Sequence, residues 1–282
     1  MEFINLVLVG PILEMFEYPA FFLEVVFGGL MSGVMYSLVA LGFVLIFKAS
    51  GVFNFAQGVF ALFAALTLVG LMTGTMPFSL DKVLPELPAW LAIIATFIVM
   101  VGLAIAVERI VLRPLVNQDH IIMFMSTIGL AFVLEGLGDT IWGSEVKALD
   151  VGIPSGNFMI GEIQIQIFDL WAAGIAAFLV VVLAVFFQST RTGRALRAVA
   201  DDHQAALSVG IPLKNIWIIV WSVAGLVALV AGIMWGSKSG VQFSLSLIAL
   251  KALPVLILGG FTSVPGAIVG GLIIGVGEKV AE

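Results

Sequence analysis

Eight apolar runs, joined by polar connections, occupy most of this chain of 282 residues. Hydrophobic residues make up 61% of it and charged residues only 11%, whereas a soluble domain has about 25% charged residues. The surface is therefore expected to be solvated mostly by lipid, and apolar runs of about 20 residues predict helices that cross the membrane. We predict an all-α polytopic integral membrane protein with seven to eight transmembrane segments.

The first six predicted segments are each long enough to span a bilayer. They run over about Phe21–Phe47, Gly51–Met72, Ala89–Leu112, Ile121–Trp142, Phe168–Phe187 and Ile216–Trp235. No low-complexity tract or soluble domain interrupts them. Residues 1–282 are accordingly expected to form a single membrane domain.

Two shorter pieces follow, Leu247–Gly260 and Ala267–Val276, and prolines and glycines interrupt both. Short, interrupted apolar segments are typical of discontinuous helices beside a transport path. Small residues also permit tight packing of ordinary helices, and the sequence leaves both interpretations open. On the first interpretation, Gly259 and Gly260 are candidate residues of a translocation path, and the C-terminal helices are short or broken.

The basic residues predict which connections face the cytoplasm. Lys48, Arg113 and the loop 189–214 fall in alternate connections, whereas 73–88 and 143–167 carry one lysine each. Cytoplasmic loops are enriched in Lys and Arg, so the first set is expected inside and the N-terminus outside. The N-terminal stretch has glutamates and no basic residue, so it is not expected to be a signal peptide. The outer connection 143–167 ends in alternating apolar and polar residues, which predicts a short hairpin.

Several functional classes are not expected. The chain has no cysteine, which excludes disulfides and thiolate metal sites. Its two histidines, His120 and His203, lack a second ligand at metal spacing, so neither a metal nor a cofactor is expected. A net charge of −6 without a basic stripe argues against nucleic-acid binding. No arrangement typical of hydrolysis is present, and an enzyme is not expected.

The connection 189–214, STRTGRALRAVADDHQAALSVGIPLK, is patterned as a helix. Thr192 is a candidate N-cap, Gly210 stands where a helix C-terminus favours glycine, and Pro212 prevents continuation. Apolar residues recur on one face, while Arg194, Arg197 and Asp201 share another. Such a helix either lies on the lipid of the bilayer through its arginines or docks into a groove of a soluble partner.

Three polar residues within apolar runs are candidates for a translocation path. Asn54 and Gln57 must find hydrogen-bond partners in lipid, either across a helix interface or in a water-filled path. Lys251 needs a counter-ion, for which Glu135 and Asp139 are candidates, unless it extends to the outer interface. Both alternatives stay open for each residue.

Several motifs resemble a known family. Gln204-Ala205-Ala206, followed after three residues by Gly210, is similar to the EAA loop of ATP-binding-cassette import permeases, with glutamine in place of the leading glutamate. The surrounding string resembles the loop of the branched-chain amino acid permease family. Residues 54–58 (NFAQG) resemble its NFAHG element, 108–114 its ERxxxRP turn, and 251–271 its glycine-rich ending. The resemblance covers nearly the whole chain in order.

Two departures from the family pattern stand out. Gln57 replaces the histidine of NFAHG, and Val59 replaces an acidic residue that often follows, so a role that needs protonation is not expected there. The family also usually has one more apolar segment beyond the position of Glu282. We therefore expect either a short gene product or an incomplete sequence.

The resemblance implies a membrane subunit of a bacterial cytoplasmic (inner) membrane importer. A second, homologous or identical permease would complete the pathway, and an external binding protein would deliver a branched-chain amino acid. Cytoplasmic ATP-binding subunits would grip 189–214 and hydrolyse ATP, because this chain has no GxxxxGK[ST] phosphate loop. Alternatives are the same importer for urea, short amides or other amino acids, an ion-coupled secondary transporter, and a non-transporting assembly subunit.

Overall fold

The computed structural model describes residues 17–75, 85–115, 118–161, 163–201, 206, 208, 210–211 and 213–282. Its longer helices are α3 (Pro19–Ser50), α5 (Ala89–Val107), α6 (His120–Trp142), α7 (Ile167–Ser189), α10 (Leu213–Ser239) and α12 (Val264–Ala281). The shorter helices are α4 (Gln57–Thr73), α8 (Arg191–Asp201) and α11 (Ile248–Gly259). Single turns η2 (Glu108–Leu112), η3 (Arg113–Leu115) and η4 (Phe243–Leu247) extend them, and β1 (Asn157–Ile160) pairs with β2 (Ile163–Gln166).

The helices coincide with the eight predicted apolar segments. In the described part of the chain, six helices are long and apolar enough to cross a membrane, and α4 and η4–α11 are shorter apolar helices. This confirms the all-α polytopic fold. The predicted hairpin is also present, with Asn157 opposite Gln166 and Ile160 opposite Ile163.

One expectation about the C-terminal pieces is wrong. The last piece, predicted over Ala267–Val276, is an unbroken helix of 18 residues, α12. Pro265 does not interrupt it because it lies in the first turn, where a backbone N–H has no intrahelical partner in any case. Only α11 is short, and it holds Pro254 in its interior.

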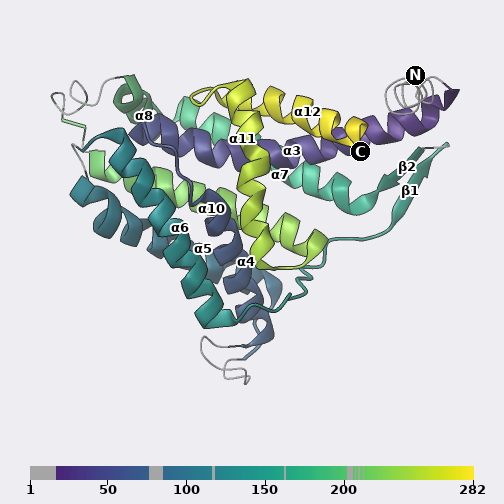
Figure 1. Ribbon diagram of the computed structural model, residues 1–282, viewed down its shortest axis with the longest axis horizontal. Coiled ribbons are helices and arrows are strands. Elements are labelled where there is room, and N and C mark those ends of the chain that lie inside the picture. The colour runs from purple at the N-terminus through teal and green to yellow at the C-terminus, as the bar shows by residue number, and fades with distance from the viewer. Residues whose placement is uncertain are drawn as a thin grey trace, which may run out of the picture.

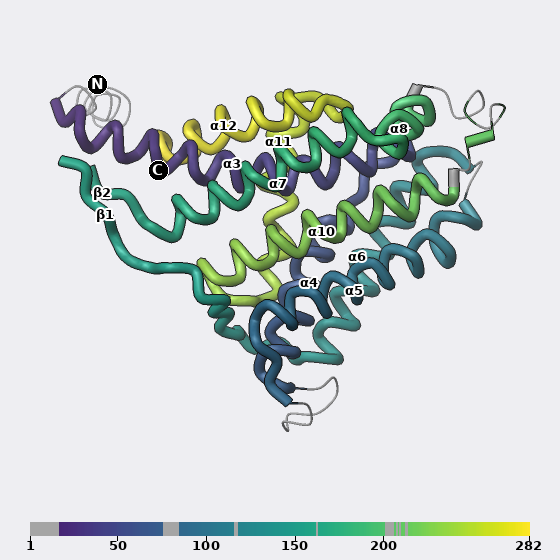
Figure 2. Tube along the Cα trace, turned by 180° about the vertical axis from the view of Figure 1, so that it is seen from behind, coloured from purple at the N-terminus to yellow at the C-terminus, as the bar shows by residue number. Residues whose placement is uncertain are grey.

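Helix α3 forms the axis around which the other helices are arranged. In Figures 1 and 2, α7, α10 and α12 run along α3, α5 and α6 slant away, and α11 crosses the direction of α3. The hairpin and α8 lie at opposite ends of the molecule. We call these the hairpin end and the α8 end.

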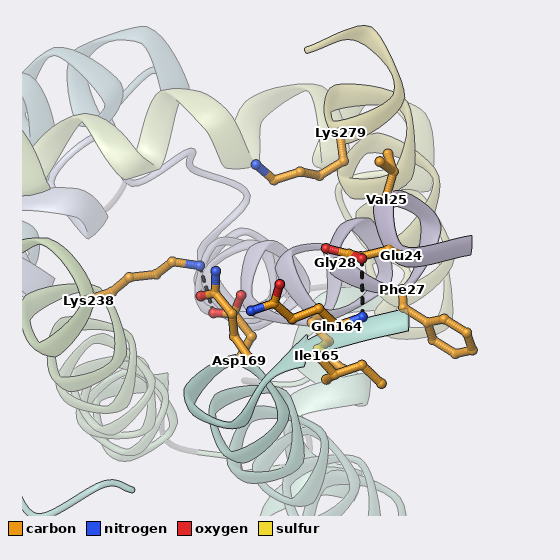
Figure 3. Close-up of a pocket in the computed structure, with 11 residues that line it drawn as sticks. Glu24, Val25, Phe27, Gly28, Gln164, Ile165, Asp169, Lys238 and Lys279 are labelled. Carbon is orange, nitrogen blue, oxygen red and sulfur yellow. Dashed lines mark hydrogen bonds and ion pairs between the residues drawn. The ribbon is translucent and has the colours of Figure 1, made fainter. Parts of the chain in front are cut away.

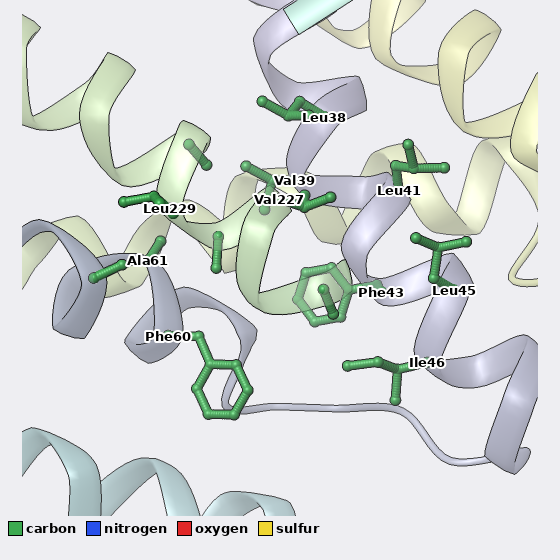
Figure 4. Close-up of a cluster of buried hydrophobic side chains, with 14 of the residues drawn as sticks. Leu38, Val39, Leu41, Phe43, Leu45, Ile46, Phe60, Ala61, Val227 and Leu229 are labelled. Carbon is green, nitrogen blue, oxygen red and sulfur yellow. The ribbon is translucent and has the colours of Figure 1, made fainter. Parts of the chain in front are cut away.

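The core surrounds the middle of α3. The twelve residues Met35–Ile46 are all buried, which is the pattern of a helix enclosed on every side. Figure 4 shows their side chains meeting residues of α4 and α10, and the rings of Phe60 and Trp221 pack edge to face at 5.7 Å. Only 28% of the most apolar window is buried in α5, α6 and α7, against 83% in α3. The three peripheral helices therefore leave most of their apolar surface exposed, as expected for helices that face lipid or another membrane subunit.

Small residues bring the backbones of α3 and α12 into direct contact. A Cβ atom on Gly33 would lie 2.6 Å from the carbonyl oxygen of Gly271, and one on Gly29 would lie 2.7 Å from Cα of Val276. Spacing of small residues by four places them on one helix face, which is the usual basis of close packing in membranes. Tight packing therefore accounts for Gly271 and Gly275 of α12. We call this contact the glycine seam, formed by Gly29, Gly33, Ser37, Gly271 and Gly275.

Replacing Gly271 by leucine should destabilise the subunit because no space exists for a side chain at the glycine seam. Overpacking of this kind costs about 1–3 kcal/mol. The midpoint of thermal unfolding of the detergent-solubilised protein should fall accordingly. Gly277→Leu on the same helix is the matched control, because nothing lies within 4 Å of a Cβ at that position. Equal midpoints for the two variants would contradict the seam's role.

Candidate functional site

The corner between α7 and α8 is fixed by Thr190 and Gly193. The Thr190 hydroxyl accepts a hydrogen bond from the Gly193 N–H at 3.1 Å and donates one to the Phe186 carbonyl at 2.6 Å. Thr190 is therefore the N-cap of α8, and the prediction of Thr192 is wrong, because the helix begins at Arg191 directly after α7 ends. A Cβ on Gly193 would lie 2.6 Å from Cα of Phe187, so this corner requires glycine.

Two arginines of α8 fasten it to the end of α7. Arg194 donates from Nη1 to the Ser189 carbonyl at 3.2 Å. Arg197 donates from Nη1 to the Phe187 carbonyl at 2.5 Å and from Nη2 to that of Gln188 at 3.4 Å. The last carbonyls of a helix lack intrahelical partners and carry partial negative charge, so cations stabilise them. Helices α7 and α8 are consequently joined as one braced corner.

The far end of the predicted coupling segment closes on Gly210. This glycine has φ +83°, and the Ile211 N–H donates to the Ala206 carbonyl at 3.0 Å. This is the hydrogen bond of a Schellman motif, as expected for a helix that ends at a glycine. Ala206 is buried, as are Leu196 and Val199 on the predicted apolar face. The remaining predicted coupling residues lie outside the described residues: Gln204, Ala205 and the side chain of Asp201.

A cavity of about 440 Å³ separates α8 from the turn between α11 and α12. The ends of α3 and α7 complete its walls, and we call it the α8-end cavity. Gly259 and Gly260 lie in the adjoining turn, where Gly260 has φ +89°. A Cβ on Gly259 would lie 2.8 Å from the backbone nitrogen of Ala267. These two candidate path residues therefore shape the tight turn that faces α8 across the cavity.

The counter-ion of Lys251 is Glu278. The Lys251 ammonium lies 2.7 Å from Oε1 of Glu278 and 3.5 Å from the Tyr36 hydroxyl. The predicted partners Glu135 and Asp139 are wrong, because α11 packs against α3 and α12 whereas α6 packs against α4. Instead, these two carboxylates line a separate cavity beside η4. The pair sits at a partly exposed surface, with 53% of the Lys251 side chain and 28% of the Glu278 side chain accessible.

Asn54 and Gln57 are fully enclosed, with exposed fractions of 0% and 1%. The Asn54 amide donates to Oε1 of Gln57 at 3.3 Å, and its oxygen accepts the Ala56 N–H at 3.1 Å. Gln57 donates from Nε2 to the Ala224 carbonyl of α10 at 3.3 Å. These contacts support the interpretation as interhelical hydrogen bonds. A share in a translocation path stays a prediction.

The same residues stand at a break in the helical backbone, between α3 and α4. Residues 51–56 are not helical, and Ala224, to which Gln57 is bonded, lies eleven residues along α10, about 16 Å from its start. Thr127 of α6 makes hydrogen bonds to the break. Its hydroxyl accepts the Phe55 N–H at 3.1 Å, and its proton is shared between the Phe53 carbonyl at 3.2 Å and the Phe124 carbonyl of α6 at 2.8 Å. The sequence prediction placed broken helices at the C-terminus and missed this one. The polar residues of the NFAQG stretch were the available signal.

A charged cavity of about 380 Å³ lies at the hairpin end, between α3, β2, α7, α10 and α12 (Figure 3). Lys238 bonds to Asp169 at 2.6 Å, and the Gln164 N–H donates to Glu24 at 3.1 Å. The sequence analysis missed these residues. The sequence gives little indication of the Asp169–Lys238 pair. Each residue stands near the end of an apolar run, and nothing in either run indicates that the two residues meet.

Removing the guanidinium of Arg197 should loosen α8. A hydrogen bond from a charged donor contributes about 1.5–3 kcal/mol, so amide hydrogen exchange in α8 should accelerate roughly tenfold or more in Arg197→Ala. Arg191→Ala is the matched control, because Arg191 is exposed and makes no side-chain hydrogen bond within the described residues. Exchange that is equally fast in both variants would contradict the bracing role.

Comparison with known proteins gives a consistent family. LivH of Escherichia coli K12, a high-affinity branched-chain amino acid transport system permease protein, is 30% identical over 293 residues, covering 95% of this chain and 88% of LivH. BraD of Pseudomonas aeruginosa, of the same description, is 32% identical over 276 residues, covering 91% and 85%. The L-arabinose permease protein AraH of Azospirillum brasilense is 28% identical over 245 residues, covering 76% and 69%. No solved structure matches the chain.

A family model also matches most of the chain. The model described as branched-chain amino acid transport system, permease component, matches residues 25–281, from the first turns of α3 to the end of α12. The match thus includes the break before α4, the braced corner of α7 and α8, and the glycine seam. The chain therefore belongs to the family of branched-chain amino acid transport system permease components.

Proposed function

We propose that this chain is the membrane permease subunit of an ATP-driven importer of branched-chain amino acids in the bacterial cytoplasmic membrane. The observation that carries the proposal is α8. It is a short polar helix outside the apolar bundle, and Arg194 and Arg197 fasten it to the end of α7. A helix in this position gives a separate subunit a rigid surface to bind.

The neighbours of α8 explain how ATP hydrolysis is coupled to movement of the permease. Cytoplasmic ATP-binding subunits hold α8 and the residues up to Gly210, and their closure displaces α8. Because α8 and α7 form one corner, this displacement moves α7 as a unit instead of bending a loop. Across the α8-end cavity it also reaches the turn that holds Gly259 and Gly260. The ATPase thereby shifts the permease between two conformations through differential contacts. ATP hydrolysis itself belongs to the ATPase subunits.

The basic residues at the α8 end support an orientation with this end in the cytoplasm. The hairpin end then faces outward, with the N-terminus, and its charged cavity adjoins the surface on which an external binding protein docks. A second permease subunit, homologous or identical, completes the pathway. The single membrane domain spans the whole of residues 1–282.

The substrate class rests on the relatives. Those named for branched-chain amino acids include LivH and BraD, at 30% and 32% identity over more than nine-tenths of this chain. The relatives named for arabinose and fructose match 76% and 64% of it. The fuller matches favour an amino acid. Urea and short amides are the principal alternatives within the same mechanism.

Transport should be tested in proteoliposomes that contain this chain, its partner permease, the ATPase subunits and the binding protein. Radiolabelled leucine should enter only with ATP on the ATPase side and an intact ATPase. Urea, glutamate, L-arabinose and fructose are assayed in parallel. ATP-dependent uptake of one of these in place of leucine would contradict the proposed substrate and support the proposed ATP-driven mechanism. Leucine uptake driven by an ion gradient without ATP would overturn the importer.

Orientation can be tested directly because the chain has no cysteine. Ser155→Cys, in the exposed connection before β1, should react with a membrane-impermeant maleimide on intact cells. Arg191→Cys, exposed at the start of α8, should react only after the membrane is permeabilised. The reverse pattern would invert the orientation and remove α8 from reach of a cytoplasmic ATPase.

A further inference from the structure

Two cations line the described walls of the α8-end cavity. They are Lys48, near the end of α3, and Arg197 of α8, and no Asp or Glu is among the described residues that line it. Arg197 donates two hydrogen bonds to carbonyls of α7. Lys48 is partly buried and forms no hydrogen bond or ion pair with any residue that the structure describes. A partly buried lysine without a described partner, beside a second cation, suits an anion from outside the chain.

The opposite wall adds to this positive field. Helix α12 begins at Val264, and its N-cap Ser263 lines the cavity together with Thr262. The Ser263 hydroxyl accepts the Gly266 N–H at 3.0 Å, so the start of α12 is ordered where it meets the cavity. The positive end of a helix of 18 residues therefore faces the same space as the two cations. Hydroxyls and a helix N-terminus are groups that suit phosphate oxygens.

The remaining lining is largely apolar, including Leu45, Phe187 and Ile268. A free inorganic anion gains nothing from such walls, whereas an amphiphile gains from both parts of the cavity. The cavity also lies at the end of the apolar bundle, where headgroups of a bilayer are found. In the proposed orientation this is the cytoplasmic leaflet, whose anionic lipids attract basic residues.

We propose that the α8-end cavity binds the phosphate headgroup of an anionic phospholipid, with Lys48 as its principal cation. The phosphate lies between Lys48, Arg197 and the start of α12, and the glycerol and upper acyl carbons contact the apolar wall. A volume of about 440 Å³ is ample for a headgroup. A lipid in this place would stand between α8 and the α11–α12 turn and set how closely they approach. That regulatory consequence rests on the proposed function, whereas the binding does not.

The test measures binding of fluorescent phosphatidylglycerol to the purified, detergent-solubilised full chain. Wild type should bind it saturably. Lys48→Gln should bind about fivefold more weakly, the factor that corresponds to roughly 1 kcal/mol per basic residue near an anionic surface. Lys48→Arg should restore binding because it keeps the charge. Lys214→Gln is the matched control, since Lys214 is exposed at the same end and does not line the cavity.

Competitors identify the ligand. Unlabelled phosphatidylglycerol should displace the probe, and phosphatidylcholine should not. Displacement by millimolar inorganic phosphate would assign the site to a free anion and overturn the lipid proposal. Equal weakening in Lys48→Gln and Lys214→Gln would indicate general attraction to a basic surface and overturn it as well. Loss of bound lipid on assembly with the ATPase subunits would assign the cavity to that partner. None of these binding measurements requires transport, so they test the lipid site even if the proposed function is wrong.

Discussion

Backbone groups inside a bilayer must find their hydrogen bonds within the protein, and this constraint organises the whole chain. Within the described residues, helices meet it along most of the chain, whereas residues 51–56, between α3 and α4, leave the helical path. There Thr127 supplies both a donor and an acceptor, and the amides of Asn54 and Gln57 connect the break to α10. Three helices must therefore be in register for one irregular segment to be tolerated. Val52, Asn54 and Ala56 of the break are buried, whereas Phe55 is exposed, and Thr127 satisfies the Phe55 N–H.

Local properties of the sequence predict the fold well, because length, hydropathy and helix ends belong to each segment by itself. The positions of the eight apolar segments, the hairpin and the glycine that ends the α8 segment are of this kind, although the length of α12 was not predicted. The partner of Lys251 cannot be predicted from local properties, because the choice between carboxylates of α6 and α12 depends on which helices pack against α11. The cap at Thr190 and the targets of Arg194 and Arg197 likewise depend on where α7 ends. Charge alone predicts an exposed face for these arginines. Arg194 is exposed and Arg197 is partly buried, and both donate to unsatisfied carbonyls of the neighbouring helix.

The two ends of α7 are held in different ways. At the hairpin end, Asp169 in its first turn is bonded to Lys238 of α10, and β2 runs directly into the helix. At the other end, hydrogen bonds to α8 replace the missing continuation of the helix. Between these points most of the surface of α7 faces lipid, with few polar contacts to hold it. A helix held at both ends by polar contacts, and along one face only by apolar packing on α3, is suited to tilt as a rigid rod.

The glycine seam also has a consequence for biogenesis. The hydroxyl of Ser37 on α3 bonds to the carbonyl of Ile268 on α12, 231 residues further along the chain. At a synthesis rate of about 5–20 residues per second, on the order of 10–50 s separate their emergence from the ribosome. During that interval the small-residue face of α3 has only lipid or the insertion machinery against it. The helix at the centre of the subunit is thus among the first to enter the membrane and among the last to be enclosed.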